Sequence, residues 1–233
     1  MKKKCIAIIV AAGNGRRMGT DIPKQYMEIG GKPLLAYSLR AFQCCDAVDE
    51  IRIVCAEDDV DKCHNLAIDF GIIKLSYILP GGASRQESVF SGLSFVDDDD
   101  IILIHDAARP FVSMAQISQV AREAKAADAA ILAAPITDTI KRIGEAGIAT
   151  LPRESLFAAQ TPQGFLGRII KQAHKTAIAD GFVGSDDASL VERLGILVNI
   201  IPSTQSNMKI TTAQDLKFAQ FLLDSEGTTY DLF

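Results

Sequence analysis

Short apolar runs alternate with amphipathic stretches along the chain as far as Ala134. The apolar runs have the length of buried strands, and the amphipathic stretches repeat apolar residues at the helical period. These patterns predict strands at residues 6–10, 50–55, 75–79, 101–104 and 129–134. They predict helices at residues 33–44, 60–70, 84–95 and 114–127. Because strands and helices take turns, we expect an α/β fold of three layers, with a mostly parallel twisted sheet between helices.

The alternation stops at residues 137–155. This stretch has no helical stripe, and Gly144 and Gly147 bracket a turn between two short runs of alternating polarity. The pattern predicts a β-hairpin that protrudes from the sheet as an arm. An isolated hairpin is only marginally stable in water, so a partner surface would stabilise the arm. Periodicity alone also allows a mobile surface hairpin.

Beyond the arm, the chain returns to the α/β pattern. We predict helices at residues 167–180, 187–194 and 212–224, and strands at residues 197–201 and 208–210. No internal repeat, linker or low-complexity segment separates these elements. We therefore expect a single domain over residues 1–233, with residues 137–155 as its arm.

Composition narrows the possible classes of function. Hydrophobic residues occupy 48% of the 233 positions, which is enough to build a full core. The formal net charge of −5 argues against a nucleic-acid partner, for which a basic face is expected. No apolar run approaches the length of a membrane span, so we expect no membrane partner. Five scattered cysteines without a C-x-x-C pair favour reduced thiols and a cytoplasmic location.

Candidate chemistry begins directly after the first predicted strand. Gly13 and Gly15 lie in a loop of small residues, where backbone N–H groups can approach a phosphate closely. Arg16, Arg17 and Lys24 follow, and three cations within nine residues of an acidic chain suggest a bound polyanion. The spacing fits neither the phosphate loop of ATPases nor the dinucleotide fingerprint G-x-G-x-x-G. For the two glycines alone, an ordinary strand–loop–helix turn explains the pattern as well.

Two further loops follow predicted strands and should meet the first one at the carboxyl edge of the sheet. One contains Gly81 and Gly82, and the spacing of Ser84 and Glu87 after them is that of a capping box that opens a helix. In the other, Asp106 comes directly after a strand, where a carboxylate can meet Mg²⁺ or a substrate hydroxyl. A structural ion pair is the alternative for this acid.

Longer blocks of sequence carry a resemblance. The run AAGNGRRMG at residues 11–19, followed by PKQY, resembles the signature of sugar-nucleotidyltransferase-like enzymes. With the blocks PGGASRQESV, HDAARPF, APITDTIKR, AAQTPQGF, SDDASLVE and NMKITTAQDL, the chain resembles the 2-C-methyl-D-erythritol 4-phosphate cytidylyltransferase family of the non-mevalonate isoprenoid pathway. The resemblance implies a Rossmann-like nucleotide-diphospho-sugar transferase fold, transfer of CMP from CTP to the phosphorylated polyol, and a homodimer built on the arm.

The resemblance also implies roles for individual residues. Arg17 and Lys24 match transition-state stabilisers, while Arg153 and Lys209 match residues that orient the acceptor for in-line attack. The positions implied to bind CTP are Ala11, Ala12, Gly13, Gly15, Lys24, Gly81, Gly82, Ser88 and Asp106. The positions implied to bind the acceptor are Asp106, Arg109, Thr139, Arg153, Thr161, Ser185 and Lys209.

A triphosphate substrate implies Mg²⁺, held mainly by phosphate oxygens and water near Asp106, so no dedicated metal cage of side chains is expected. No general base is needed, because the second pKa of a phosphate monoester is about 6 and the attacking group is already ionised. Two other functions share parts of the pattern. Ribitol-5-phosphate cytidylyltransferases share HDA-x-RPF and QTPQ, and a non-catalytic nucleotide-binding module could have the same fold.

Overall fold

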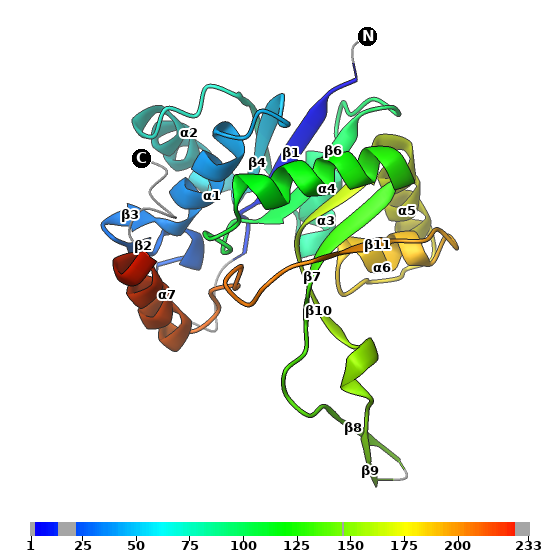
Figure 1. The fold of residues 1–233 in the computed structure, drawn as a ribbon. Coiled ribbons are helices and arrows are strands. Elements are labelled where there is room, and N and C mark those ends of the chain that lie inside the picture. Colours follow the sequence, from blue (N-terminus) through cyan, green and yellow to red (C-terminus); the bar gives the residue numbers. More distant parts are fainter. Residues whose placement is uncertain (1–2, 14–21, 146, 227–233) are drawn as a thin grey trace.

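A computed structural model of the chain describes residues 3–13, 22–145 and 147–226. At its centre is a seven-stranded sheet with the order β11-β7-β10-β6-β1-β4-β5 (Figure 1). The strands are β1 (Cys5–Val10), β4 (Glu50–Cys55), β5 (Leu75–Pro80), β6 (Ile101–Asp106), β7 (Ala129–Pro135), β10 (Phe157–Leu166) and β11 (Asn199–Pro202). Only β10 runs antiparallel to the other strands of this sheet, which confirms the mostly parallel α/β fold.

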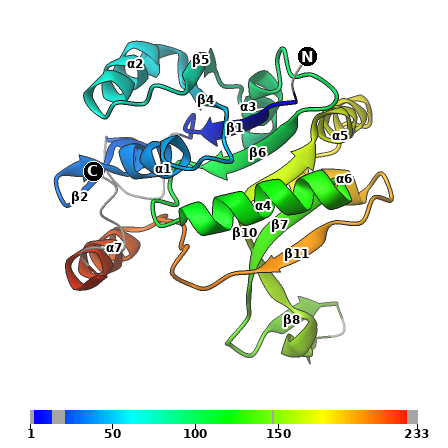
Figure 2. The ribbon, with the colours of Figure 1, turned by 45° about the horizontal axis from the view of Figure 1, so that its top comes forward.

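Helices cover both faces of the sheet (Figures 1 and 2), as the alternation predicts. One face carries α1 (Leu34–Gln43), α2 (Val60–Asp69) and α4 (Met114–Ala127). The other carries α3 (Arg85–Gly92), α5 (Gly167–Ala179) and α6 (Asp187–Glu192). The last helix, α7 (Ala213–Glu226), packs beside a small hairpin of β2 (Glu28–Ile29) and β3 (Lys32–Pro33), which the sequence pattern does not predict. Among the described residues, no helix is long and apolar enough to cross a bilayer.

The strands β4 and β6 are buried along their whole length, and β1 is buried at all but its last residue. A parallel sheet that is covered on both faces shields every side chain of its inner strands, which explains the continuous apolar run of β1. Gly92 of α3 faces this sheet, and a Cβ atom there would overlap Ile8 and Val54. The glycine therefore allows α3 to lie close against β1 and β4, and this contact fixes the helix whose first turn borders the candidate site.

The strand β10 is missing from the prediction. Its sequence FAAQTPQGFL contains alanine, glutamine, glycine and proline, which are poor strand formers on their own. Neighbours on both sides, β6 and β7, hold it in the sheet, with a register shift between Ala159 and Gln163. Tertiary pairing thus overrides local propensity, and it places Thr161 beside the end of β6.

The predicted strand at residues 208–210 is wrong. This segment joins no sheet, because the backbone N–H of Ile210 donates to the carbonyl oxygen of Ala108, 2.8 Å away in the loop after β6. The same contact carries Lys209 to the carboxyl edge of the sheet. Two helix ends also come earlier than predicted: α3 ends at Gly92, before Phe95 adopts a left-handed φ of +58°, and α6 ends at Glu192.

The predicted arm is confirmed as a hairpin. Its strands, β8 (Lys141–Gly144) and β9 (Gly147–Thr150), pair with each other and project away from the central sheet (Figure 1). A 3₁₀ turn, η4 (Arg153–Ser155), then leads back to β10. Two isoleucines near the tip are largely exposed, Ile143 at 82% and Ile148 at 72%.

Candidate active site

A cavity of about 510 Å³ opens at the carboxyl edge of the sheet. The loops after β1, β5 and β6 line it, together with Ala56 after β4, the turn that carries Lys24 and the segment that carries Lys209. The loops that the sequence predicts to converge therefore do so. The described lining residues include three cations and a single carboxylate: Lys24, Arg85 and Lys209 against Asp106. Such a positive cavity in an acidic chain suits a polyanionic ligand.

The first two loops pass each other at close range. The backbone N–H of Ala11 donates to the carbonyl oxygen of Val54 at 2.7 Å, and that of Gly81 donates to Cys55 at 2.8 Å. A Cβ atom on Gly81 would overlap the side chains of Ala12 and Ser88. Position 81 therefore needs glycine for this close approach, which leaves backbone groups lining the cavity without intervening side chains.

A short turn places Lys24 at the cavity. This 3₁₀ turn, η2 (Lys24–Tyr26), is held on one side by Gln25, whose side-chain amide donates to the carbonyl oxygen of Ala11 at 2.6 Å. On its other side, the Tyr26 hydroxyl lies 3.3 Å from the Sγ atom of Cys63 on α2. The turn is thus tied both to the first loop and to the helix layer, so the backbone of Lys24 is fixed relative to the sheet.

The first turn of α3 borders the cavity with satisfied backbone groups. Ser84 Oγ accepts from the backbone N–H of Glu87 at 3.1 Å, and the Glu87 carboxylate accepts from the N–H of Ala83 at 3.0 Å. Ser84 is therefore the N-cap as predicted, but the reciprocal bond of Glu87 goes to Ala83 and not to the N–H of Ser84, as a capping box would require. Ser88 Oγ donates to the carbonyl oxygen of Ser84 at 2.8 Å and accepts from the N–H of Gly82 at 3.2 Å. Ser88 thereby fixes the glycine loop from behind.

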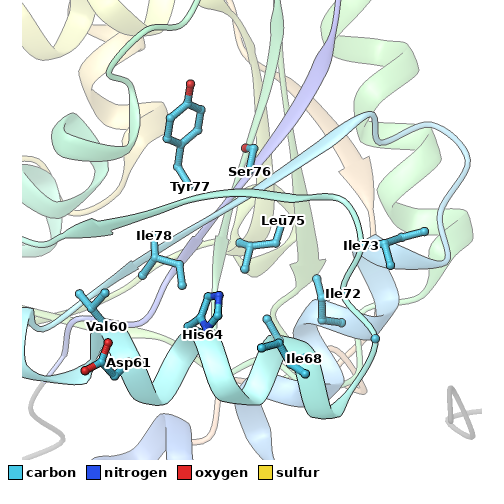
Figure 3. A pocket seen from close by; sticks show the side chains of 12 residues that line it. Val60, Asp61, His64, Ile68, Ile72, Ile73, Leu75, Ser76, Tyr77 and Ile78 are labelled. Carbon is cyan, nitrogen blue, oxygen red and sulfur yellow. The ribbon is translucent and has the colours of Figure 1, made fainter.

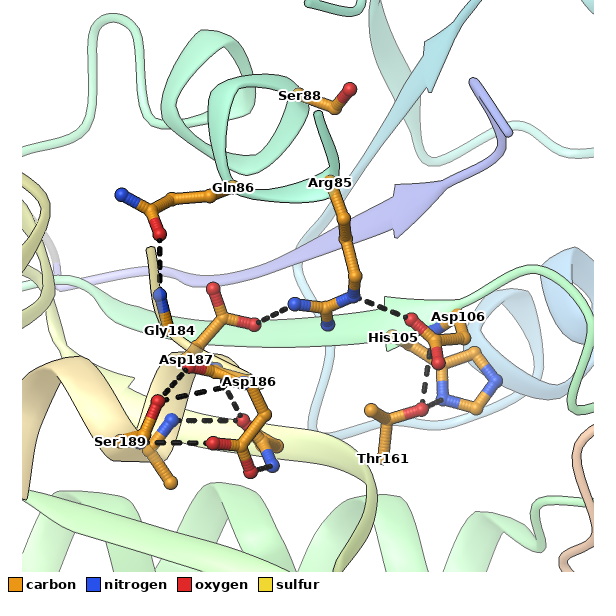
Figure 4. Close-up of polar contacts among 12 residues, drawn as sticks. Arg85, Gln86, Ser88, His105, Asp106, Thr161, Gly184, Asp186, Asp187 and Ser189 are labelled. Carbon is orange, nitrogen blue, oxygen red and sulfur yellow. Dashed lines mark hydrogen bonds and ion pairs between the residues drawn. The ribbon is translucent and has the colours of Figure 1, made fainter. Parts of the chain in front are cut away.

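Asp106 is the acidic centre of the cavity (Figure 4). Its Oδ1 atom lies 3.0 Å from Nε of Arg85, and its Oδ2 atom lies 2.6 Å from Nζ of Lys209. Burial opposes ionisation of this carboxyl group, but Arg85 and Lys209 outweigh burial and hold the pKa of Asp106 well below its usual range. Asp106 is therefore a permanent anion that keeps two cations at the cavity wall.

Behind Asp106, a fully buried histidine fixes the end of β6 (Figure 4). Nε2 of His105 lies 3.1 Å from the carbonyl oxygen of Arg109, which can only accept, so Nε2 carries the proton. Nδ1 then accepts from the Thr161 hydroxyl at 3.1 Å, and that hydroxyl oxygen accepts from the N–H of Asp106 at 3.1 Å. Burial lowers the pKa of His105 to about 4, although the charge of Asp106 opposes this shift.

The structure brings many of the predicted site residues together. Those that line the one cavity are Ala11, Ala12, Gly13, Lys24, Gly81, Gly82, Ser88, Asp106 and Lys209. Gly15 and Arg17 lie outside the described residues. Thr161 lies beneath Asp106, and Arg109 is buried, with Nη1 donating to the carbonyl oxygen of Asn207 at 2.7 Å. Arg109 therefore ties the segment before Lys209 to the end of β6.

The remaining predicted residues lie away from the cavity lining. Thr139 and Arg153 share a separate cavity of about 380 Å³ at the base of the arm, where Arg153 Nη1 donates to the carbonyl oxygen of Thr137 at 3.0 Å. Ser185 is exposed and directly precedes Asp186, the N-cap of α6. Within this single chain, the residues implied to bind the acceptor thus lie in three places: at Asp106, at the base of the arm, and before α6.

Sequence reasoning misses several residues that build the site. Asp187 is the first residue of α6, and its carboxylate lies 2.8 Å from the guanidinium of Arg85. The obvious sequence feature of this stretch is the apolar pattern of the helix, so no local signal points to the cavity. Gln25 follows Lys24 in the PKQY block, but its contact with Ala11 depends on the fold. The role of His105 as a neutral donor depends on β10, which the pattern does not predict.

A larger cavity of about 720 Å³ lies elsewhere, between α2 and the edge strand β5 (Figure 3). Its lining is mostly apolar, including Ile68, Ile72, Leu75 and Ile78, and no lysine or arginine is among its described lining residues. His64 points into it from α2. Because the described cations gather at the smaller cavity, electrostatics and strand topology favour that cavity over this groove as the site for a polyanion.

Comparisons with known proteins agree with one another on a single family. The model of a protein family described as 2-C-methyl-D-erythritol 4-phosphate cytidylyltransferase matches residues 5–225. A protein of that name from Geotalea uraniireducens is 44% identical, covering 94% of this chain and 96% of its own. A protein of the same name from Halalkalibacterium halodurans is 45% identical, covering 93% of this chain and 95% of its own. A crystal structure of 4-diphosphocytidyl-2C-methyl-D-erythritol synthase from Anaerococcus prevotii has a TM-score of 0.85 and 30% identity, covering 95% and 96%.

We predict that buried, neutral His105 destabilises the folded protein as the pH falls from 6.5 towards 4. Unfolded histidine takes up a proton below about 6.5, whereas folded His105 does so only near 4. The unfolded state therefore binds more protons in this window, and acidification favours it by about 2 kcal/mol between pH 6.5 and 4.5. The free energy of unfolding, measured with urea at pH 6.5 and at pH 4.5, tests this difference.

The control for this prediction is a pair of matched variants. His105→Gln removes the titrating group. Its free energy of unfolding should therefore fall by about 2 kcal/mol less than that of the wild type over the same pH window. His64→Gln, at an exposed position, should follow the wild type. Equal pH dependence of His105→Gln and wild type would contradict the assignment.

Proposed function

The chain belongs to the 2-C-methyl-D-erythritol 4-phosphate cytidylyltransferase family, and we propose that the cavity around Asp106 is where it transfers CMP from CTP to 2-C-methyl-D-erythritol 4-phosphate. The products are 4-diphosphocytidyl-2-C-methyl-D-erythritol and pyrophosphate, in isoprenoid precursor biosynthesis. The observation that carries the proposal is that Lys24, Lys209 and Asp106 meet at one cavity beside two glycine loops.

The reaction needs positioning and charge stabilisation more than proton transfer. A phosphate oxygen of the acceptor attacks the α-phosphorus of CTP, the bond to the bridging oxygen breaks, and its electron pair leaves with pyrophosphate. Negative charge builds on the α-phosphoryl oxygens, and Lys24 and Arg17 would stabilise it. The loss of one preorganised contact of this kind commonly lowers kcat by about 10²–10³-fold.

The acceptor would bind beside Asp106. Lys209 would hold its phosphate in line with the α-phosphorus, while Asp106 accepts from hydroxyl groups and keeps Lys209 in place. Thr161 and Arg109 support this corner from below, through the end of β6. On the CTP side, the backbone of Ala11–Gly13 and Gly81–Gly82 would meet the base and the triphosphate.

The donor set fits a Mg²⁺ ion that enters with CTP. One permanently ionised carboxylate, Asp106, faces the cavity, and the described part of the chain holds no group of three or more His, Cys, Asp or Glu side chains that could cage a metal. The ion would be held mainly by phosphate oxygens and water, with Asp106 nearby. When bound, it would neutralise phosphate charge at the site of attack.

The arm points to a homodimer. Ile143 and Ile148 are exposed on a two-stranded hairpin, which a second protomer would cover and stabilise. Arg153 and Thr139 lie on this arm and do not line the cavity around Asp106 of the same chain. A two-fold partner could therefore bring the arm residues of one protomer to the acceptor at the cavity of the other. All five cysteines are free thiols, which favours a cytoplasmic location for this dimer.

The proposed reaction is tested by release of pyrophosphate from CTP with each candidate acceptor. We expect turnover with 2-C-methyl-D-erythritol 4-phosphate and at least about a hundredfold lower kcat/KM with ribitol 5-phosphate, because a misplaced polyol loses in-line geometry. Ribitol phosphate as the better substrate would favour the alternative cytidylyltransferase. CTP binding without pyrophosphate release from any acceptor would favour the non-catalytic module.

We predict that Ile143→Asp combined with Ile148→Asp converts the dimer to monomer, because both apolar side chains would be buried at the proposed interface. Sedimentation velocity measures the change, and kcat/KM for the acceptor should fall with it because Arg153 loses its place. Ile73→Asp, at an 86% exposed position distant from the arm, is the matched control and should leave both unchanged. A double variant that remains dimeric would refute the arm interface.

A further inference from the structure

The first turn of α3 has two faces. Ser84, Arg85 and Ser88 line the cavity, whereas Gln86 points away from it, towards the segment that precedes α6 (Figure 4). That segment, residues 182–186, has no regular secondary structure and carries Ser185. The helix turn that borders the CTP side of the cavity therefore also contacts the segment that carries a predicted acceptor residue.

Gln86 bridges two backbone groups of this segment. Its Oε1 atom accepts from the N–H of Gly184 at 3.0 Å, and its Nε2 atom donates to the carbonyl oxygen of Phe182 at 3.1 Å (Figure 4 shows the first contact). One side-chain amide thus satisfies a donor and an acceptor that lie two residues apart. A Cβ atom on Gly184 would overlap Leu190, Ser189 and the carbonyl oxygen of Asp186, so the chain here is closely packed.

The residues after Ser185 are anchored independently. Asp186 caps α6 and accepts from Gln163 Nε2 at 2.7 Å, while Asp187 pairs with Arg85 at 2.8 Å. Burial opposes ionisation of Asp187, but Arg85 and His174 together outweigh burial and keep the pKa of Asp187 low. Ser185 therefore sits between an anchor at Gly184 and an anchor at residues 186–187, and Gln86 supplies the first of these.

We propose that Gln86 is a positioning residue for the acceptor: it fixes the backbone of residues 182–185 from the CTP-binding helix and so sets where the Ser185 hydroxyl meets the acceptor. The inference rests on the proposed function and on the acceptor-binding role that the family resemblance implies for Ser185. Gln86 touches neither substrate in this account. Its removal should weaken acceptor binding and leave the bond-breaking step and CTP binding nearly intact.

The test uses Gln86→Met in the full-length protein, because methionine matches the length and the helix propensity of glutamine but makes neither hydrogen bond. With two modest hydrogen bonds lost, KM for 2-C-methyl-D-erythritol 4-phosphate should rise about three- to tenfold. We expect kcat and KM for CTP to stay within about twofold of wild type. Gln172→Met is the matched control, since the exposed Gln172 amide donates to Thr176 of its own helix.

A second readout measures the bridge itself. Hydrogen–deuterium exchange should become faster for the peptide that covers residues 182–187 in Gln86→Met, because the amide of Gly184 loses its acceptor. Exchange elsewhere in α3 and α6 should match wild type. Ser185→Ala should raise the acceptor KM as well, and adding Gln86→Met to it should raise KM less than the product of the two single effects.

The outcomes separate the inference from the function on which it rests. A wild-type protein that releases no pyrophosphate overturns the proposed function and the acceptor role together. An active wild type with an unchanged acceptor KM in Gln86→Met overturns the inference alone, whatever the exchange rates. Unchanged exchange at residues 182–187 overturns the bridge. If kcat falls in Gln86→Met and the KM values for CTP and for the acceptor both rise, Gln86 is a general structural residue, and the proposed positioning role is refuted.

Discussion

The site depends on one buried carboxylate, Asp106, held between Arg85 and Lys209. A charge at this depth is costly unless it is paired, and each partner places a cation where phosphates would bind. Arg85 is held in turn by Asp187, and Lys209 by the backbone contact of Ile210 with Ala108. The ion pairs therefore connect β6, α3, α6 and the segment before α7 at a single point.

The fold serves this arrangement by making its edge rigid. Parallel strands end together, so the loops after β1, β5 and β6 meet without long connections. Gly81 allows two of these loops to touch, and Gly92 allows α3 to press on the sheet. Neutral His105 links the end of β6 to Thr161 on the antiparallel strand β10. Each of these contacts removes freedom from groups that would otherwise reorganise when a triphosphate binds.

Features that depend on local sequence could be predicted, and those that depend on distant contacts could not. The apolar run of β1, Ser84 as the N-cap of α3 and the position of Asp106 at the end of a strand could all be predicted from the local sequence. β10 could not be predicted, because its proline, glutamines and glycine form a strand only between the neighbouring strands β6 and β7. The pairing of Asp187 with Arg85 spans 102 positions, and no periodicity reports it. The separation of Arg153 from the cavity around Asp106 likewise depends on the fold, because Arg153 lies at the base of the arm.

The most direct measurement is a double-mutant cycle on kcat/KM for the acceptor, with Asp106→Asn, Lys209→Met and the double variant. If Asp106 acts largely by holding Lys209, kcat/KM of the double variant should be at least about tenfold higher than the value expected from multiplying the two single losses. The exposed pair of Asp180 and Arg193, at 2.8 Å, provides a control cycle without loss of activity. Strictly multiplicative losses for Asp106 and Lys209 would show that the two act independently, and the account would fail.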